Sequence, residues 1–144
     1  MPLQSNPFGQ TILTDDILDT LGFFDAWEDR YKYIIDLGKE LPAMAAANQI
    51  DENIVRGCQS QVWILSDFDG SKLWFEVDSD AFIVKGLLGV VLAAYNGKSP
   101  REILDFDIES YFDQLELMQH LSSTRGNGLR AMVQKIQQTA QLAS

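Results

Sequence analysis

One cysteine is the side chain of this sequence best suited to covalent chemistry. Cys58 is the only cysteine among 144 residues, and it lies in the stretch Arg56-Gly57-Cys58-Gln59-Ser60-Gln61-Val62-Trp63. The thiolate is the reactive form, and the positive charge of Arg56 is expected to lower the thiol pKa. Gly57 lets the backbone turn and lets another molecule approach closely. The pattern predicts a reactive thiol in a loop; from spacing alone, the alternative is a buried cysteine that packs as a small hydrophobic residue.

Two further side chains could assist such a thiol. His120 is the only histidine and could act as a base for Cys58, although its surroundings equally fit a histidine with a structural role at a helix end. Arg125 opens the sequence Arg125-Gly126-Asn127-Gly128 near the predicted start of the last helix, where the helix dipole disfavours a cation. It is either an exposed loop residue or a group that docks a partner and stabilises charge near Cys58.

No pattern in the sequence predicts a metal, cluster or paired-carboxylate site. Iron–sulfur clusters are held mainly by several cysteine thiolates, and this chain has one. A zinc site would need Cys58, His120 and carboxylates to converge from distant segments. The acidic residues are scattered over predicted helix starts and exposed faces, so we expect no metal.

Composition limits the kinds of partner and the compartment. The formal net charge is −10, which disfavours nucleic acid because phosphate binding needs clustered Lys and Arg. The same charge leaves open a basic protein partner, or it serves solubility alone. No signal peptide is visible after Met1, and the apolar run 81–95 is shorter than the ~20 residues that span a bilayer. With a single cysteine, these features predict a cytoplasmic protein.

Hydrophobic periodicity predicts helices on both sides of the cysteine. Residues 1–13 are expected to form an extended arm. Before the cysteine, one helix is expected from Thr14 as N-cap to Gly22 and a second from Asp25 to Gly38. After it, helices are expected over 81–95, following a cap in 78–80, from the capping box Ser99-Pro100-Arg101-Glu102, and over 108–115. The last helix is expected to begin at about Ser123, and its buried stripe consists of Leu129, Met132, Val133 and Ile136.

The segment between these helices predicts a hairpin. Residues 61–66 alternate as a strand, 67–70 form an Asp-Gly turn, and 72–77 return with Leu73, Phe75 and Val77 on the inner face. A brief third strand is expected at 53–55. The result is one domain over residues 1–144 of the α+β class, in which helices cover one face of a small antiparallel sheet.

Taken together, these stretches resemble the SufE family of sulfur-acceptor proteins, which includes the CsdE branch. The likeness runs in one order over roughly residues 14 to 140. The matching residues are Trp27-Glu28, Tyr31, Leu37-Gly38-Lys39, Leu41-Pro42, Gly57 to Trp63, Asp78-Ser79-Asp80, Ile83 to Leu87, Leu121-Ser122, Arg125, Gly128-Leu129 and Ala131. The segment 6–9 is more similar to the CsdE branch, whereas Gln59-Ser60-Gln61 is similar to SufE proper.

The resemblance implies a fold shared with iron–sulfur scaffold proteins and a role in sulfur transfer. Such proteins take persulfide sulfur from a pyridoxal-phosphate cysteine desulfurase of the SufS or CsdA type, stimulate that enzyme, and pass the sulfur to an iron–sulfur scaffold or another acceptor. The implied acceptor is Cys58, with Arg56, Gly57, Gln59, Asp80 and Arg125 at the partner surface and His120 nearby. The chain itself would need no cofactor, since pyridoxal phosphate belongs to the partner, and would be a monomer or weak dimer.

Three other functions remain open at this point. A free-standing sulfurtransferase acting on small molecules would need a defined base, a substrate pocket and activity without a partner. An iron–sulfur scaffold is disfavoured by the single cysteine. A purely structural interaction protein predicts that Cys58→Ser keeps all function. The leading expectation is an accessory sulfur carrier rather than a stand-alone enzyme.

Overall fold

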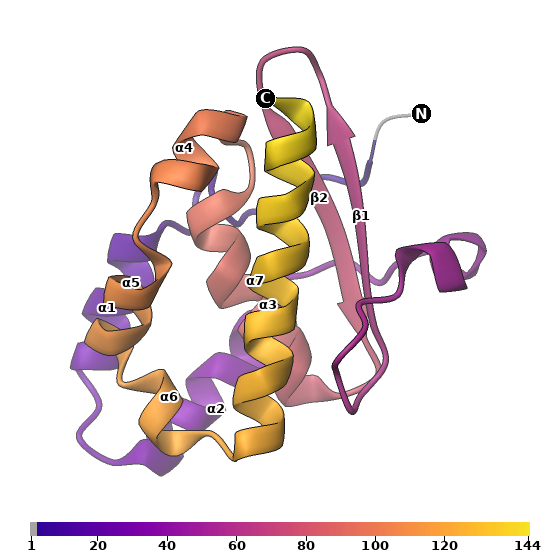
Figure 1. Ribbon diagram of the computed structural model, residues 1–144. Coiled ribbons are helices and arrows are strands. Elements are labelled where there is room, and N and C mark those ends of the chain that lie inside the picture. Colours follow the sequence, from indigo (N-terminus) through magenta and orange to yellow (C-terminus); the bar gives the residue numbers. More distant parts are fainter. Residues whose placement is uncertain (1–2) are drawn as a thin grey trace.

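A two-stranded antiparallel sheet packs against a layer of helices (Figure 1). This computed structural model describes residues 3–144, so residues 1 and 2 of the predicted arm lie outside the described residues. The strands are β1 (Val62–Phe68) and β2 (Leu73–Ser79). The helices, in chain order, are α1 (Thr14–Gly22), α2 (Trp27–Gly38), α3 (Phe82–Tyr95), α4 (Pro100–Asp105), α5 (Ile108–Leu115), α6 (Leu117–His120) and α7 (Ser123–Ala143), with the 3-10 helices η1 (Ala46–Asn48) and η2 (Asp51–Asn53) before the sheet. The predicted α+β class is confirmed.

Helix α3 occupies the centre of the core. It is apolar on nearly every side, which is typical of a helix that is buried all round. It packs on β2, where Leu73, Phe75 and Val77 form the predicted inner face and are each 1% exposed, and it also contacts α1, α2 and α7. No helix within residues 3–144 combines the length and the apolar character needed to cross a membrane.

The hairpin forms as predicted, but its turn lies two residues further along the chain. The strands pair from Val62 with Ser79 to Phe68 with Leu73, so β1 continues past Ser66. The side chain of Asp69 explains the shift, because Oδ1 accepts hydrogen bonds from the backbone N–H groups of Lys72 at 2.7 Å and Ser71 at 2.8 Å. These hydrogen bonds, together with one that Trp74 Nε1 donates to Asp69 Oδ2 at 2.9 Å, lower the pKa of Asp69 to about 2.

The expected third strand is reduced to an isolated bridge. Residues 51–53 form η2 instead, and only Ile54 bridges to Trp63 on β1. The N–H of Val55 then donates to the carbonyl of Val62 at 2.9 Å. Pairing stops there because the chain turns at Gly57, whose φ of 93° is incompatible with a continuing strand.

Two predicted helix starts are wrong by one or two residues. Leu13, rather than Thr14, is the N-cap of α1, and its N–H donates to Asp16 Oδ2 at 2.8 Å. Helix α2 begins at Trp27 rather than after Asp25, because Ala26 has an extended backbone with ψ of 136°. Helices α4 and α5 begin where the sequence predicts, and Ser99 and Glu102 form the expected capping box.

The amino-terminal segment is held against the sheet and α3. Phe8 is completely buried, and the carbonyl of Pro7 accepts backbone hydrogen bonds from Gln10, Thr11 and Ile12. The buried Asn96 side chain joins three segments: Oδ1 accepts from the N–H of Phe75 at 2.8 Å, and Nδ2 donates to the carbonyl of Phe8 at 3.0 Å. The attachment to β2 extends back to Gln4, since Asn6 Nδ2 donates to the Phe75 carbonyl at 3.1 Å and Gln4 N–H donates to Glu76 Oε1 at 3.0 Å.

Candidate functional site around Cys58

The cysteine lies in a tight loop between η2 and β1. The hydrogen bond from Val55 N–H to the Val62 carbonyl closes the base of this loop, so residues 56–61 project beyond the end of the sheet. Gly57 turns the backbone in the left-handed region, at φ of 93°, which side chains other than glycine rarely adopt. This turn directs Cys58 toward α7.

The Cys58 side chain is half-buried against the first turns of α7. Its thiol donates a hydrogen bond to the carbonyl of Gly128, with Sγ 3.5 Å from the oxygen. A methyl group added at Gly128 would lie 3.6 Å from Sγ, so any larger side chain there would compete with the thiol for space. Burial raises the pKa of the Cys58 thiol, whereas the sequence predicted that Arg56 would lower it. In this conformation, burial favours the protonated thiol over the thiolate.

A small cavity of about 70 Å³ adjoins the thiol. It is lined by the Cys58 loop, by α3 and by the start of α7, through Cys58, Gln59, Ser60, Val84, Ser122, Thr124, Arg125, Gly128 and Met132. A water molecule takes about 30 Å³ of liquid volume, and pockets for drug-sized ligands measure roughly 300–1,000 Å³. The cavity has room for an additional sulfur atom, but it cannot enclose a drug-sized substrate.

Arg125 lines this cavity, a position close to Cys58 that fits one of the two alternatives left open by the sequence. It lies in the first turn of α7, where its N–H donates to the capping Ser122 Oγ at 3.2 Å. Its guanidinium reaches across to α2, with Nη1 3.5 Å from the hydroxyl oxygen of Tyr31. Within residues 3–144, no carboxylate lies within 4.0 Å of the Arg125 guanidinium, so its positive charge is not neutralised by an ion pair.

Neither Arg56 nor His120 lines the cavity beside the thiol. Arg56 is exposed and lines a separate groove, of about 260 Å³, between its own segment and α7. His120 stacks on Trp27, with ring centroids 4.2 Å apart and an interplanar angle of 15°, and it does not line the Cys58 cavity. The geometry therefore gives no support to His120 as a base for Cys58.

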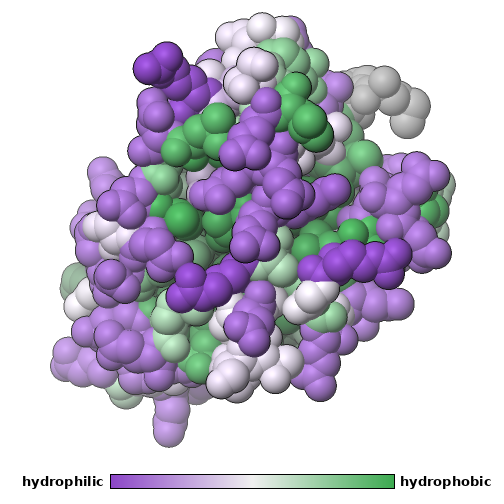
Figure 2. All heavy atoms as spheres, viewed as in Figure 1, coloured by the Kyte–Doolittle hydropathy of each residue, from purple (hydrophilic) through white to green (hydrophobic). Residues whose placement is uncertain are grey.

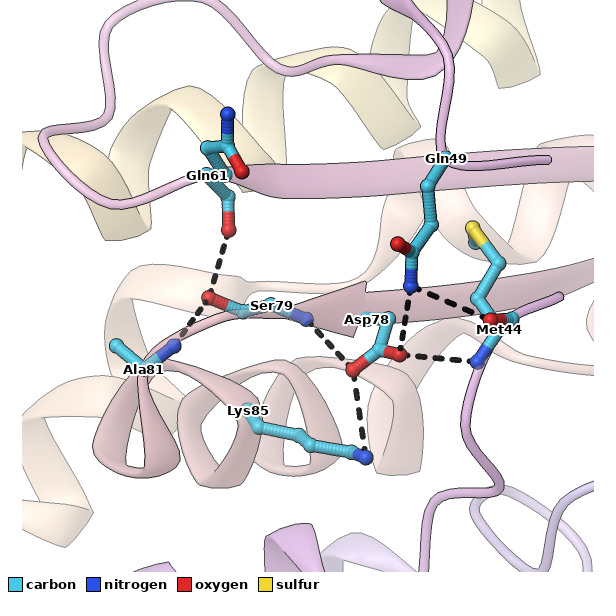
Figure 3. A network of polar contacts seen from close by, with 7 residues as sticks. All are labelled: Met44, Gln49, Gln61, Asp78, Ser79, Ala81 and Lys85. Carbon is cyan, nitrogen blue, oxygen red and sulfur yellow. Dashed lines mark hydrogen bonds and ion pairs between the residues drawn. The ribbon is translucent and has the colours of Figure 1, made fainter. Parts of the chain in front are cut away.

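Asp80 supports the far end of the cysteine loop. Its Oδ1 accepts a hydrogen bond from Gln61 N–H at 3.1 Å, and its own N–H donates to the Gln61 carbonyl. Ser79 Oγ donates to the same carbonyl at 2.8 Å and accepts from Ala81 N–H at 3.2 Å (Figure 3). Ala81, rather than a residue of 78–80, is the N-cap of α3, so the predicted cap acts chiefly as a brace for the Cys58 loop.

Behind this brace is a buried ion pair. Asp78 Oδ1 lies 3.3 Å from Lys85 Nζ on α3, and its Oδ2 accepts a hydrogen bond from Met44 N–H at 2.9 Å (Figure 3). Asp78 is 6% exposed. The pair ties the end of β2 to α3 and to the segment before η1, and so fixes the strand end from which Ser79 and Asp80 project.

Sequence reasoning missed Val84 and Met132 as residues of the cavity wall, and Tyr31 as the hydrogen-bond partner of Arg125. All three lie in segments with an apolar pattern, which predicts burial in the core. Their packing into the cavity walls, or their contact with Arg125, depends on how α2, α3 and α7 meet. Within the described part of the chain, no three His, Cys, Asp or Glu residues are arranged to hold a metal ion.

A family model described as "SufE: Fe-S metabolism associated domain" matches residues 15–140. The chain belongs to the SufE family. It is 46% identical over 131 residues to an uncharacterized SufE-like protein of Rhizobium meliloti (strain 1021), covering 88% of this chain and 94% of the relative. It is also 46% identical over 132 residues to an uncharacterized SufE-like protein of Rhizobium etli, covering 89% of each. Membership of the SufE family associates the protein with iron–sulfur metabolism.

The fold is also found in a solved structure. The solution structure of a hypothetical protein from Thermus thermophilus matches 97% of this chain and 98% of its own, with a TM-score of 0.72. Sequence identity between the two is 18%, so this likeness concerns the fold alone. It confirms the α+β architecture in which the SufE family segment carries Cys58.

Proposed function

We propose that this protein accepts a sulfur atom on Cys58 from the persulfide of a pyridoxal-phosphate cysteine desulfurase and passes it to an iron–sulfur assembly scaffold. One observation carries the proposal: the only thiol of a SufE-family chain lies in a projecting loop, beside a cavity large enough for one more sulfur atom. A cytoplasmic setting suits this chemistry, because a reducing compartment keeps a lone thiol free.

The transfer step follows the rules of thiol–disulfide exchange. Cys58 first loses its proton to solvent or to a base of the partner. Its thiolate attacks the outer sulfur of the donor persulfide; a new S–S bond forms on Cys58 while the donor S–S bond breaks. The donor cysteine leaves as a thiolate and no net oxidation occurs. Removal of its sulfur frees the donor for another turnover, which accounts for stimulation of the desulfurase.

The resting position of Cys58 suits storage better than attack. Burial keeps the thiol protonated, and the thiolate is the attacking form. The loop must therefore move Cys58 away from the Gly128 carbonyl and into the partner when it collects sulfur. Return to the cavity would then shield the persulfide from other thiols and oxidants, with the Arg125 guanidinium at the cavity wall to face its negative charge.

The free-standing sulfurtransferase is less consistent with this geometry. Such an enzyme needs a base and a pocket for its small substrate. The cavity beside Cys58 is about 70 Å³, and His120 is stacked on Trp27 instead of facing the thiol. A protein donor that brings its own persulfide to the Cys58 loop requires neither a base nor a substrate pocket in this chain.

Intact-mass measurement tests the proposal directly. The protein is mixed with candidate cysteine desulfurases, pyridoxal phosphate and free cysteine, beside the Cys58→Ser variant. We expect a gain of one sulfur atom, reversed by reductant and absent in the variant, together with faster desulfurase turnover. Full alkylation of Cys58 with no sulfur adduct and unchanged turnover across the desulfurases would reject the proposal.

A further inference from the structure

We propose that the face formed by the Cys58 loop and α7 docks an acidic surface of the sulfur donor, through Arg56, Arg125 and Lys135. This inference rests on the proposed function, which supplies the donor, and it adds the chemistry of the donor's contact surface. It also reverses the expectation drawn from the net charge, which left open a basic partner.

The charges of the chain are segregated along its sequence. Of the 21 acidic residues, none lies in 53–66 or in 117–144, the two segments that contain the Cys58 loop and the whole of α7. The same segments carry the cations Arg56, Arg125, Arg130 and Lys135. A protein of net charge −10 therefore has two stretches that are locally cationic.

The fold brings these two stretches together. Gly128 of α7 accepts the Cys58 hydrogen bond, and a Cβ added at Gly57 would lie 3.4 Å from the Cβ of Ala131 one helical turn further on. Arg125 lines the cavity on one side of the loop. Arg56 and Lys135 line the groove of about 260 Å³ on the other side. Cations of both segments thus flank the contact between the loop and α7, and the carboxylate bonded to the loop is that of Asp80, at Gln61.

These three cations are available to a partner. Among residues 3–144, Arg56, Arg125 and Lys135 have no carboxylate within 4.0 Å, whereas Arg130 on the same helix pairs with Glu109 at 3.0 Å. Gln134 and Gln138 complete the polar wall of the groove. Figure 2, which views the molecule from the side that α7 crosses, shows hydrophilic side chains along this face with hydrophobic atoms between them.

Charge on this face decides how a donor is oriented. In physiological salt, charges act over a Debye length of about 8 Å, so a docking partner senses the local cations more than the distant acidic surface. An acidic donor surface is repelled elsewhere and attracted here, next to Cys58. A basic donor surface would be drawn to the acidic faces, away from the thiol. The arrangement therefore fits carboxylates around the donor's persulfide.

The experiment compares two charge-matched variants with the wild-type chain. Arg56→Gln with Lys135→Gln removes two cations from the proposed face. Lys72→Gln with Lys98→Gln removes two cations at the hairpin turn, where Leu73 bridges to Lys98, a full strand length from the Cys58 loop. Arg125 is left intact because it lines the cavity of the thiol. Sulfur loading of Cys58 is followed by mass at limiting concentrations of the desulfurase that loads the wild-type chain, over a series of salt concentrations.

We expect wild-type loading to slow as salt rises. The Arg56–Lys135 variant should load about tenfold more slowly at low salt and with a flatter salt dependence, while the Lys72–Lys98 variant behaves as wild type. Equal rates for all three proteins, or loading that accelerates with salt, would overturn the docking proposal. A third outcome would also overturn it: the wild-type chain binds a single-stranded oligonucleotide, the Arg56–Lys135 variant does not, and sulfur loading of the two proteins is the same. The face would then serve nucleic acid.

A low-molecular-weight persulfide separates this test from the proposed function. Such a donor has no protein surface, so it should load Cys58 equally in all three proteins. That result, with slow loading of the Arg56–Lys135 variant by the desulfurase, supports docking through this face. If no donor of either kind loads Cys58 in the wild-type chain, the proposed function itself fails, and the docking proposal fails with it.

Discussion

At the scale of a single residue, the environment of Cys58 decides when its chemistry can occur. The thiol is half-buried and donates to the Gly128 carbonyl, and burial raises its pKa. A thiol that remains protonated in its resting position reacts slowly with stray oxidants. Under the proposed function, sulfur transfer through Cys58 therefore requires movement of the loop or the approach of a partner.

The raised pKa predicts the pH dependence of alkylation. The rate of reaction of Cys58 with iodoacetamide should rise with a midpoint above that of the same cysteine in the unfolded chain, because burial disfavours the thiolate. Between those two pKa values the unfolded state binds fewer protons than the folded state, so stability should fall as pH rises through this range. Alkylation followed by mass, with and without denaturant, checks both states. Equal midpoints would contradict the burial of Cys58.

At the scale of elements, a short loop braced at both ends presents the cysteine. Val55 closes its base against Val62, and Ser79 and Asp80 hold Gln61 at its other end. Gly57 is the point at which the chain changes direction. The same few hydrogen bonds therefore stabilise the loop and fix the position of the Cys58 side chain.

Replacing Gly57 with alanine should destabilise the fold by about 1–2 kcal/mol, because a non-glycine residue is strained in the left-handed region. The variant should also alkylate faster at Cys58, since relief of the strain opens the loop. Urea unfolding and alkylation rates measure the two effects. Gly22→Ala is the matched control: its φ lies outside the left-handed region and no atom approaches an added Cβ within 4 Å, so little loss is expected.

The buried ion pair behind the loop predicts a second effect on stability. Asp78→Asn should cost about 2–3 kcal/mol, because it leaves Lys85 without its partner and weakens the acceptor for Met44 N–H. Asp36→Asn, which breaks the exposed pair with Lys39 at 3.1 Å, should cost less than about 0.5 kcal/mol. Similar losses in denaturant unfolding of the two variants would show that burial of the Asp78 pair does not matter.

At the scale of the whole molecule, three segments distant in sequence meet at one amide. Asn96 links the amino-terminal segment at Phe8, strand β2 at Phe75 and the end of α3. Its side chain is 2% exposed, so water cannot replace the hydrogen bonds that it makes. The packing of the amino-terminal segment against β2 and the end of α3 depends on these hydrogen bonds.

Asn96→Ala should therefore destabilise the protein by about 2–4 kcal/mol, because the Phe75 N–H and the Phe8 carbonyl both lose their partners in a buried site. Thermal and urea unfolding measure the loss. Asn127→Ala, at an exposed position of α7, serves as the control and should change stability by no more than about 0.5 kcal/mol. Sulfur loading of Cys58 should be retained in folded Asn96→Ala protein, since the substitution lies away from the thiol.

Charge is the other property that belongs to the whole molecule. A net charge of −10 describes the average surface, but the face around Cys58 carries three cations without carboxylate partners among residues 3–144. Summed charge left open a basic partner or a role in solubility alone, whereas the distribution of charge around Cys58 is the basis for proposing an acidic one. Only the distribution acts on a docked partner, because salt screens distant charges.

The sequence by itself determined most of the elements and identified the only thiol. Periodicity, capping and turn residues are local properties, so they predicted the hairpin, the inner face of Leu73, Phe75 and Val77, and every α-helix except the short α6. Cys58 could be singled out without the structure, because it is the only thiol in the sequence. Where local signals failed, at the third strand and at the starts of α1 and α2, a single turn or a competing hydrogen bond decided the outcome.

Only the tertiary structure decided what surrounds that residue. The sequence placed Arg56 next to Cys58 and left His120 as a candidate base, but Arg56 lines the neighbouring groove, His120 stacks on Trp27, and the fold brings Arg125 and Gly128 to the thiol's cavity. It also converts an expected lowering of the thiol pKa into a rise, through burial. The physical reason is that desolvation, cavity shape and the local field depend on which segments meet, and residues 58 and 128 meet only when α7 packs beside the loop.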